Sequence, residues 1–395
     1  MQKLYKQSLI STTIVAAVLL ITACEGLFDG RFNQIQPQKV FSMDLFEQNV
    51  RDTFTNASVG FTYAIAQNGS LVRGGEVGFG RTQFEPAGTR LMERNQRMHI
   101  ASISKTITTA AVLRLLQDTP GVGLDSGVEP YLPAAWVRGP GIGNDALTFR
   151  HLLAHKSGFF HGQVAPGETD DRLADHIAIG NILPQEPAVY DNANHAMFRV
   201  IIPNLLGVEH TDSSETLEAF HARVFGTYVQ DVVFTPAGVP AARATTVPPA
   251  NANRYYPWPY DQLPGVEGTD FSLSYGAYGW YMSVVDLLAV LTYLRFTEDI
   301  ISHESRAIMN DERLGWWNTR TGDHGTYHMK QGGWFWTNNP VEKGMQSIAA
   351  NYSAGVQAVV IVNSRRDPSA TDPSLQPIDM AGVMRDAFDN AFVSP

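Results

Sequence analysis

The sequence predicts an α/β (α+β) fold, in which an antiparallel sheet flanked by helices is built from both ends of the chain. Residues 58–80 and 326–363 carry the alternating or continuously apolar patterns that are typical of strands. Residues 119–325 contain helix candidates separated by loops and no clear strand, so we expect a mainly helical insertion. We therefore predict a sheet-containing domain of residues 45–118 and 326–395, and a mainly helical domain of residues 119–325.

The first strands lie between two predicted helices. Residues 44–54 have helical periodicity, and residues 58–66 then alternate large apolar and smaller side chains. The dipeptide Asn68-Gly69 is a hairpin signal, which makes residues 70–80 the returning strand. Residues 99–118 follow as a largely apolar helix, which we expect to be buried.

The middle of the chain carries short helix candidates between segments rich in glycine and proline. Thr148 is a candidate N-cap for a helix over residues 149–155. The other helix candidates are a short capped helix over residues 124–133 and residues 194–206, 213–226 and 283–294. Residues 235–268 hold many of the prolines, and we expect them to form a long excursion over the surface.

Strand patterns return near the C-terminus. They cover residues 326–336, 346–350 and 355–363, and the last of these is the apolar run of a buried strand. Residues 378–392 close the chain as an amphipathic helix. Strands from the two ends of the chain are therefore expected to meet in one sheet.

Composition places the protein in the globular class. The chain has 395 residues, of which 44% are hydrophobic and 17% charged, enough for two domains or one large composite one. Its net charge of −10 argues against a nucleic-acid partner.

The N-terminus predicts export. Two lysines precede an apolar run over residues 10–21 that is short for a membrane span and leads into Cys24. This ending resembles the bacterial lipoprotein box, in which the cysteine carries lipid. We expect residues 1–24 to be a signal peptide with a lipobox and residues 25–44 a tether, with a lipid anchor holding the protein on a membrane of the bacterial cell envelope. The alternative is an ordinary signal peptide or membrane anchor with an incidental cysteine.

Ser102 and Lys105 form the first candidate for catalysis. They are three residues apart in the predicted helix and therefore share one face. A lysine held there can take the proton of the hydroxyl if burial and positive neighbours keep the amine neutral, and the helix start favours a developing oxyanion. The alternative is a capping serine beside a solvated lysine, but Lys105 lies in an apolar stretch where an unused charge would be costly.

Two further segments carry groups that fit the same chemistry. Tyr190 could pass a proton to a leaving group, and Asn192 could hold a substrate carbonyl and orient the lysine; the alternative is a loop tyrosine and a turn asparagine. Lys330-Gln331-Gly332-Gly333 lies in a strand pattern that could offer a second positive charge and backbone N–H groups; the alternative is a bulge in an edge strand. Lys156-Ser157-Gly158 fits the same short pattern but lies in a loop after a helix.

No metal or cofactor is predicted. His151 and His155 have the i, i+4 spacing of a helical metal site, but no acidic residue lies between them as in the zinc-protease pattern.

In this order, the segments around Ser102, Tyr190 and Lys330 resemble the serine β-lactamase and penicillin-binding-protein superfamily. They are most similar to its class C-like branch, which includes esterases and D-amino-acid peptidases. The resemblance covers roughly residues 45–392, includes the flanking segment His151–Gly158, and implies a β-lactamase/transpeptidase-like fold.

The resemblance also implies a role for each candidate residue. Ser102 would be the acylated nucleophile, Lys105 its base and Tyr190 the partner acid/base. Asn192 would bind the substrate amide, and Lys330 would be an electrostatic anchor. The backbone N–H groups of Ser102 and Gly333 would form the oxyanion hole.

Two departures from the family pattern bear on the substrate. Gln331 stands where β-lactam-directed members usually carry a hydroxyl that helps to bind the carboxylate of the drug. Trp334 and Trp336 follow, either as an aromatic wall for an apolar acyl group or as core residues.

We therefore predict an exported serine hydrolase that forms an acyl-enzyme at Ser102 and hydrolyses an ester or amide of a small molecule or peptide, with an ester slightly favoured. The first alternative is a β-lactamase, D,D-carboxypeptidase or D-aminopeptidase that acts on β-lactams or cell-wall peptides. The second is a catalytically idle lipoprotein that binds cell-wall peptide.

Overall fold

The computed structural model describes residues 39–140, 142, 146–159, 167–180, 187–338, 341–366 and 376–395. The chain forms two compact units. In the described part of the smaller unit, β1 (Val40–Phe41) pairs antiparallel with β13 (Phe392–Val393). The larger unit, Met43–Ala391, holds the main sheet and the helices. The predicted signal peptide, Cys24 and most of the predicted tether lie outside the described residues.

In the described part of the chain, the main sheet has nine strands, and its central strands come from both ends of the sequence. The continuous order is β12-β6-β10-β11-β2-β3-β4; β9 also pairs with β10, and β8 with β9. All pairs are antiparallel except β12 with β6. The strands are β2 (Gly60–Gln67), β3 (Ser70–Arg81), β4 (Arg90–Leu91), β6 (Tyr256–Trp258), β8 (Arg320–Gly322), β9 (Gly325–Asn338), β10 (Val341–Asn351), β11 (Val356–Val362) and β12 (Ser364–Arg366). The predicted fold class is thus confirmed.

The first hairpin follows the turn chemistry of its sequence. Asn68 and Gly69 join β2 to β3 with φ angles of +50° and +82°. Glycine and asparagine tolerate this left-handed region best, which is why the pair marks a two-residue hairpin turn.

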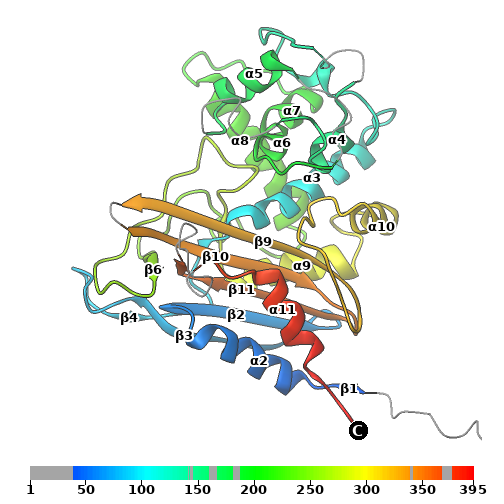
Figure 1. The fold of residues 1–395 in the computed structure, drawn as a ribbon. Coiled ribbons are helices and arrows are strands. Elements are labelled where there is room, and N and C mark those ends of the chain that lie inside the picture. The colour runs from blue at the N-terminus through cyan, green and yellow to red at the C-terminus, as the bar shows by residue number, and fades with distance from the viewer. Residues whose placement is uncertain are drawn as a thin grey trace, which may run out of the picture. The chain divides into compact units, whose positions relative to one another are not determined.

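Helices cover both faces of the sheet (Figure 1). α2 (Met43–Thr55) and α11 (Met380–Asp389) pack against each other on one face, and α9 (Val284–Phe296) packs on β2 and β11 from the other. Phe388 of α11 stacks on Tyr352 with 4.4 Å between ring centroids. Because both faces are covered, β11 is buried along its whole length, as its apolar run predicts.

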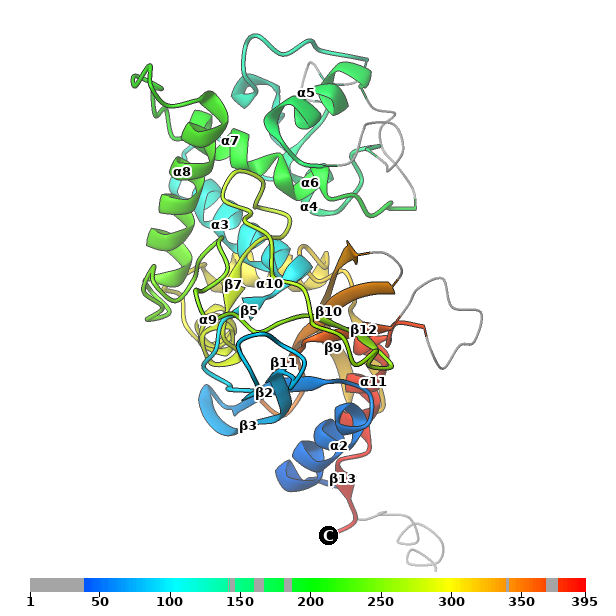
Figure 2. The same cartoon turned by 90° about the vertical axis from the view of Figure 1, so that its left-hand side faces the viewer.

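The other helices gather on the side of α3 that faces away from β2 and β3 (Figure 2). They are α4 (Phe149–Leu153), α5 (Asp170–Ile179), α6 (Ala193–Ala196), α7 (Phe198–Leu205) and α8 (Leu217–Val229), which continues as a π-helical turn (Gln230–Phe234). α10 (His303–Asp311) lies nearer the sheet. Thr148 caps α4 as predicted, because its side chain accepts from the N–H of His151.

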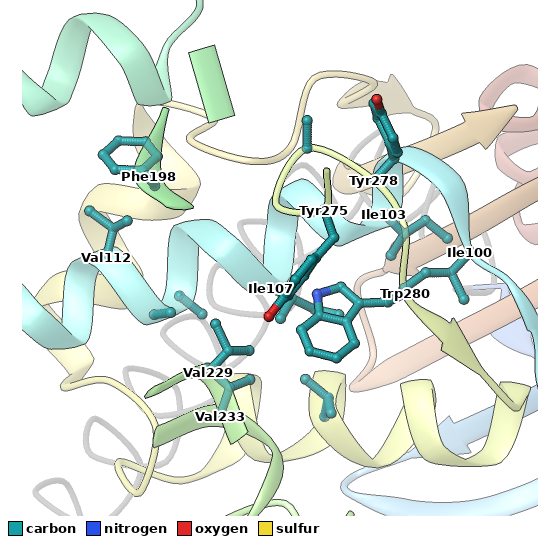
Figure 3. Close-up of a cluster of buried hydrophobic side chains, with 14 of the residues drawn as sticks. Ile100, Ile103, Ile107, Val112, Phe198, Val229, Val233, Tyr275, Tyr278 and Trp280 are labelled. Atoms are coloured by element: carbon teal, nitrogen blue, oxygen red, sulfur yellow. The ribbon is translucent and has the colours of Figure 1, made fainter. Parts of the chain in front are cut away.

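The buried helix that the sequence predicts is α3 (Ser104–Asp118), although it begins two residues after Ser102. Ser102 itself lies in a preceding 3₁₀ turn, η1 (Ala101–Ile103). Ile107 of α3 lies in the hydrophobic core near Trp280 (Figure 3). Because α3 is packed on nearly all sides, few charged side chains occur along it.

Threonines in α3 act as anchors to neighbouring loops. Thr106 Oγ1 donates to the backbone oxygen of Gly315 at 2.8 Å, and Thr108 Oγ1 donates to that of Gly276 at 2.6 Å. Threonine is a mediocre helix former, so these residues are better explained by tertiary contacts than by helix propensity.

The expectation of no clear strand between residues 119 and 325 is wrong at three places. β6 and β8 join the main sheet, and β7 (Tyr281–Met282) pairs with β5 (Met98–His99). Each is only two or three residues long, too short for an alternating pattern to show. The larger unit contains both predicted domains, and the boundary between them stays a prediction.

Part of the proline-rich segment 235–268 is buried, which corrects the expected surface excursion. Tyr255 and Tyr256 are both inaccessible to solvent. The Tyr256 hydroxyl donates to Glu85 Oε1 at 2.8 Å, and that of Tyr255 accepts from the N–H of His99 at 3.0 Å. Aromatic rings with satisfied hydroxyls suit the interior, so this segment fills a gap beside the sheet. Among the described residues, no helix is both long and apolar enough to cross a bilayer.

Candidate active site

Ser102 stands at a sharp bend between a strand and a helix. Ala101, just before it, has a φ angle of +47°, in the left-handed region that residues other than glycine rarely adopt. Such a conformation persists only where its surroundings hold it. Here Ser347 Oγ on β10 donates to the backbone oxygen of Ile100 at 2.9 Å and ties the bend to the sheet.

Lys105 is buried one helical turn after Ser102, and its amine has three partners. Nζ lies 3.2 Å from Ser102 Oγ and donates to Asn192 Oδ1 at 2.7 Å and to the backbone oxygen of Ala277 at 2.8 Å. The side chain is 0% exposed. The amide and the backbone oxygen are neutral acceptors, so they fix the amine without stabilising its charge as a carboxylate would.

Tyr190 approaches Ser102 from the loop before α6, and its hydroxyl donates to Ser102 Oγ at 2.8 Å. His155 holds this loop in place. Its backbone oxygen accepts from the N–H of Val189 at 3.0 Å, and its Nδ1 accepts from the N–H of Asp191 at 3.3 Å. The His155 ring also stacks on the Tyr190 ring at 4.5 Å. The segment after α4 therefore serves to position the tyrosine.

β9 brings Lys330 and two glycines to the other side of the bend. Lys330 Nζ donates to the Tyr190 hydroxyl at 3.3 Å, and its side chain is almost wholly buried. A Cβ at Gly332 would lie 2.7 Å from the backbone oxygen of Ile100, so only glycine lets the strand pass this close. At Gly333 the space is open, and the nearest atom to a new Cβ would be 3.8 Å away.

Burial dominates the electrostatics of this group. It lowers the pKa of Lys105 to about 7, against the negative charges of Glu168 and Asp191, which raise it. Burial, and then the charge of Lys105, lower the pKa of Lys330 well below its usual value. Burial raises the pKa of Tyr190. Near neutral pH, Lys105 can therefore accept a proton while Tyr190 remains a neutral phenol.

A cavity of about 680 Å³ opens beside Ser102. Trp317, which is 40% exposed, lies in its wall with its ring 5.3 Å from that of Tyr190. The rest of the described lining is Asn318, Arg320, Lys330, Gln331, Gly332, Gly333, Gln346, Arg365, Pro377, Ile378 and Asp379. The volume suits a small molecule or the end of a peptide.

The residues that depart from the pattern of the resembled family, Gln331, Trp334 and Trp336, lie in different surroundings. Gln331 lines the cavity, but its amide oxygen accepts from the N–H of Ala381 at 3.2 Å. Trp334 packs on Tyr278 with 4.5 Å between ring centroids, and Trp336 stacks on Tyr255, also at 4.5 Å. Both tryptophans are partly buried against the hydrophobic core. Neither tryptophan belongs to the described lining of the cavity, so the aromatic wall that the sequence suggested is not formed by them.

The structure brings all the predicted catalytic and substrate-binding residues together around Ser102: Lys105, Tyr190, Asn192, Lys330, Gln331, Gly332 and Gly333. The sequence reasoning missed three contributors. Trp317 lines the cavity, the backbone oxygen of Ala277 accepts from Lys105, and Glu168 lies beside Asn192. Ala277 acts through its backbone, and the other two stand alone in loops, so no motif marks them.

The described residues contain no group of three or more His, Cys, Asp or Glu arranged to hold a metal ion. His151 and His155 have other partners: Nδ1 of His151 accepts from the N–H of Thr148 at 3.2 Å, and His155 supports Tyr190. Their spacing therefore reflects local structure.

Comparisons with known proteins agree with this geometry. A family model described as Beta-lactamase matches residues 46–376. Penicillin-binding protein 4* of Bacillus subtilis (strain 168) is 25% identical over 166 residues, 39% of this chain; the chain spans only 32% of that relative.

Two solved structures show the same fold. D-amino acid amidase from Ochrobactrum anthropi SV3 has a TM-score of 0.60 and 18% identity, over 88% of this chain and 96% of that one. A β-lactamase/D-alanine carboxypeptidase from Yersinia pestis has a TM-score of 0.61 and 14% identity, over 89% of this chain and 99% of that one.

We expect Gly332→Ala to destabilise the protein and Gly333→Ala to leave its stability nearly unchanged. At position 332 the new methyl group meets the backbone of Ile100, so β9 or the bend must shift, at a cost of about 1–3 kcal/mol. At position 333 it enters open space. Thermal unfolding of the pair measures the difference. Equal unfolding temperatures would contradict the close approach of β9 to the bend.

Proposed function

The chain belongs to the β-lactamase family, and from this premise we propose that it is an exported serine hydrolase that forms an acyl-enzyme at Ser102. Members of this family are serine hydrolases. One observation carries the proposal: Ser102 Oγ is contacted at once by the amine of Lys105, at 3.2 Å, and the phenol of Tyr190, at 2.8 Å. A nucleophile, a base and an acid within reach of one another fit acyl transfer.

Acylation begins when Ser102 Oγ attacks the carbonyl carbon of the substrate and Lys105 Nζ takes the hydroxyl proton. The N–H groups of Ser102 and Gly333 would bind the oxyanion that forms. As the bond to the leaving group breaks, Tyr190 gives its proton to the leaving oxygen or nitrogen. Protonated Lys105 then returns a proton to the phenolate, so both groups regain their starting states.

Hydrolysis reverses this sequence with water in place of the leaving group. Lys105 takes the proton of Tyr190, and the phenolate takes a proton from the water as the water attacks the acyl carbon. The bond to Ser102 Oγ then breaks, and protonated Lys105 returns a proton to Oγ. Lys330, which donates to the Tyr190 hydroxyl, stabilises the negative charge that develops there in each half-reaction.

Among substrates, we favour a small ester over a β-lactam. Trp317 gives the cavity an apolar face, and Gln331 offers no hydroxyl for a carboxylate and has its amide oxygen engaged by α11. An amide or peptide substrate is the alternative, supported by the similarity to an amidase, a carboxypeptidase and a penicillin-binding protein.

A catalytically idle protein that binds cell-wall peptide is the rival from another functional class. A fluorophosphonate separates the two, because it forms a covalent adduct only with an activated serine. We expect the adduct on the peptide that contains Ser102, detected by mass spectrometry, and none on Ser102→Ala.

The rate of this labelling should rise with pH through about 7, because only neutral Lys105 accepts the proton and burial lowers the pKa of that amine to about 7. Below that value the lysine is protonated and the rate falls about tenfold per pH unit; above it the rate levels off. Lys105→Arg stays protonated and should lose at least about 100-fold at every pH.

The matched control is Lys343→Arg. Lys343 is also buried, on β10, but its amine donates to the backbone oxygen of Pro264 and does not contact the site. This variant should keep the wild-type pH profile. Wild-type labelling by Lys105→Arg would show that Lys105 is not the base.

Gln331→Thr should raise the rate of cephalosporin hydrolysis relative to that of a p-nitrophenyl ester. A threonine hydroxyl can donate to the β-lactam carboxylate, and a hydrogen bond to a charged group contributes about 1.5–3 kcal/mol, or roughly ten- to over a hundred-fold in rate. Gln331→Val is the matched control, because valine has the shape of threonine but no hydroxyl. Both variants lose the hydrogen bond that the Gln331 amide oxygen accepts from Ala381. If both variants change the ratio of rates equally, the hydroxyl does not set specificity.

We also propose that residues 1–23 are removed on export and that Cys24 then carries lipid. Mass spectrometry of the mature protein should find a lipidated N-terminal cysteine, and Cys24→Ser should release the protein from membranes. An unmodified Cys24 within an uncleaved chain would contradict the lipid anchor.

A further inference from the structure

A buried carboxylate that the acylation steps do not use lies beside Asn192. Glu168, in the loop before α5, is only 8% exposed. Its side chain accepts from the hydroxyl of Tyr278 and lies near enough to the side chain of Asn192 for the amide to favour its charged form. The oxygen of the same Asn192 amide accepts from Lys105 Nζ at 2.7 Å. One side-chain amide thus links the carboxylate to the proposed base.

The loop that carries Glu168 is held by a buried ion network. Arg199 of α7 donates to the backbone oxygen of Glu168 at 2.6 Å and to Asp170 Oδ1 at 2.9 Å. Asp170 Oδ2 lies 2.6 Å from Nδ1 of His221 on α8. A buried guanidinium is tolerated only with such partners, and here they fix the backbone on both sides of Thr169. Arg199 of α7 and His221 of α8 therefore fix the position of the loop that carries Glu168.

We propose that Glu168 is a positioning residue that acts through Asn192: its buried carboxylate orients the amide so that the amide oxygen faces Lys105. The inference rests on the proposed function of Ser102 and Lys105. An amide whose N–H₂ group donates to a carboxylate must present its oxygen to the amine. The reversed amide would place donors against Lys105 and an oxygen against Glu168.

The groups that surround Lys105 come from several elements: Lys330 on β9, Tyr190 and Asp191 in the loop before α6, His195 on α6, His155 after α4, and Glu168 before α5. Burial lowers the pKa of both histidines well below the usual value, so they are neutral. The charge of Lys105 lowers the pKa of Lys330, after burial, and the two carboxylates favour the charged form of Lys105, Glu168 the more strongly.

The groups that face Glu168 act in both directions on its charge. Burial raises the pKa of Glu168, and the charge of Asp191 adds to this rise. The hydrogen bond from Tyr278, the attraction of Lys105 and the neighbouring amide of Asn192 lower it. Loss of the Tyr278 hydroxyl would therefore raise the pKa of Glu168 further and favour its neutral form.

The test is the pH profile of fluorophosphonate labelling in Glu168→Gln. Glutamine keeps the size and the polar contacts of the side chain but removes its charge. The acidic limb of the profile should move to lower pH by about one unit, because Lys105 then loses its proton more readily. A merely structural role would lower the rate at all pH values and leave the limb in place.

Two further variants complete the experiment. Tyr278→Phe should move the limb in the same direction by a smaller amount, and it decides the question if Glu168→Gln does not fold. Glu85→Gln is the matched control: Glu85 is also buried and accepts from a tyrosine, Tyr256, but it is not among the groups around Lys105. The acidic limb of the labelling profile of Glu85→Gln should stay at the pH of the wild-type protein.

The outcomes separate this inference from the proposed function. If the wild-type protein is not labelled at Ser102, the proposed function fails and the role of Glu168 with it. If the wild-type protein is labelled with an acidic limb, but the limb stays in place in every folded variant of Glu168 and Tyr278, only the role of Glu168 is overturned.

Discussion

The active-site structure depends on the burial of one amine without a directly paired carboxylate. A free lysine is protonated at neutral pH and cannot take a proton from a serine. Complete burial lowers the pKa of Lys105 to about 7, whereas a carboxylate in direct contact would raise it again. The structure places neutral oxygens from Asn192 and Ala277 against the amine and keeps Glu168 one amide away. Lys105 thus has partners for its N–H groups and can still serve as a base.

This environment requires segments that are distant in the sequence to meet. α3 carries Lys105, a loop ordered by His155 supplies Tyr190, and β9 brings Lys330 against that phenol. β9 in turn pairs with β10, whose Ser347 holds the strained bend before Ser102. The sheet that joins both ends of the chain is therefore the frame on which the nucleophile and the second lysine are aligned.

The sequence predicts the parts of this fold that have a repeating or local signal. The run before Asn363 marks a buried strand, Asn68-Gly69 marks the hairpin, and the apolar stretch after Ser102 marks α3. The strands β6, β7 and β8 are too short to show a period, so they could be found only from their tertiary pairing. Tyr256 shows what the sequence pattern cannot predict. Its proline-rich segment has the composition of an exposed loop, but its tyrosines are buried in the interior.

The candidate site residues also fall into two groups, those that a local sequence motif marks and those that only the fold brings to the site. Ser102, Tyr190 and Lys330 can be found because each lies in a short segment that resembles a family motif. Trp317 and Glu168 stand outside those segments, and only the fold shows that one lines the cavity and the other lies beside Asn192.

The groups that hold Lys105 and the residues that line the cavity come mostly from different segments of the chain. The groups that hold Lys105 come from α3, the loop before α6 and the loop at Ala277, whereas most of the cavity wall comes from β9, the segment of residues 317–320 and the segment before α11. Changes in the wall therefore alter the space for a substrate without removing the acceptors that fix the base. Among the described residues, Ser102, Tyr190 and Lys330 belong to both sets. Each lines the cavity; Ser102 and Tyr190 also lie against Lys105, and Lys330 donates to the Tyr190 hydroxyl. The shape of the cavity can thus be adjusted for different acyl groups while the chemistry of Ser102 stays the same.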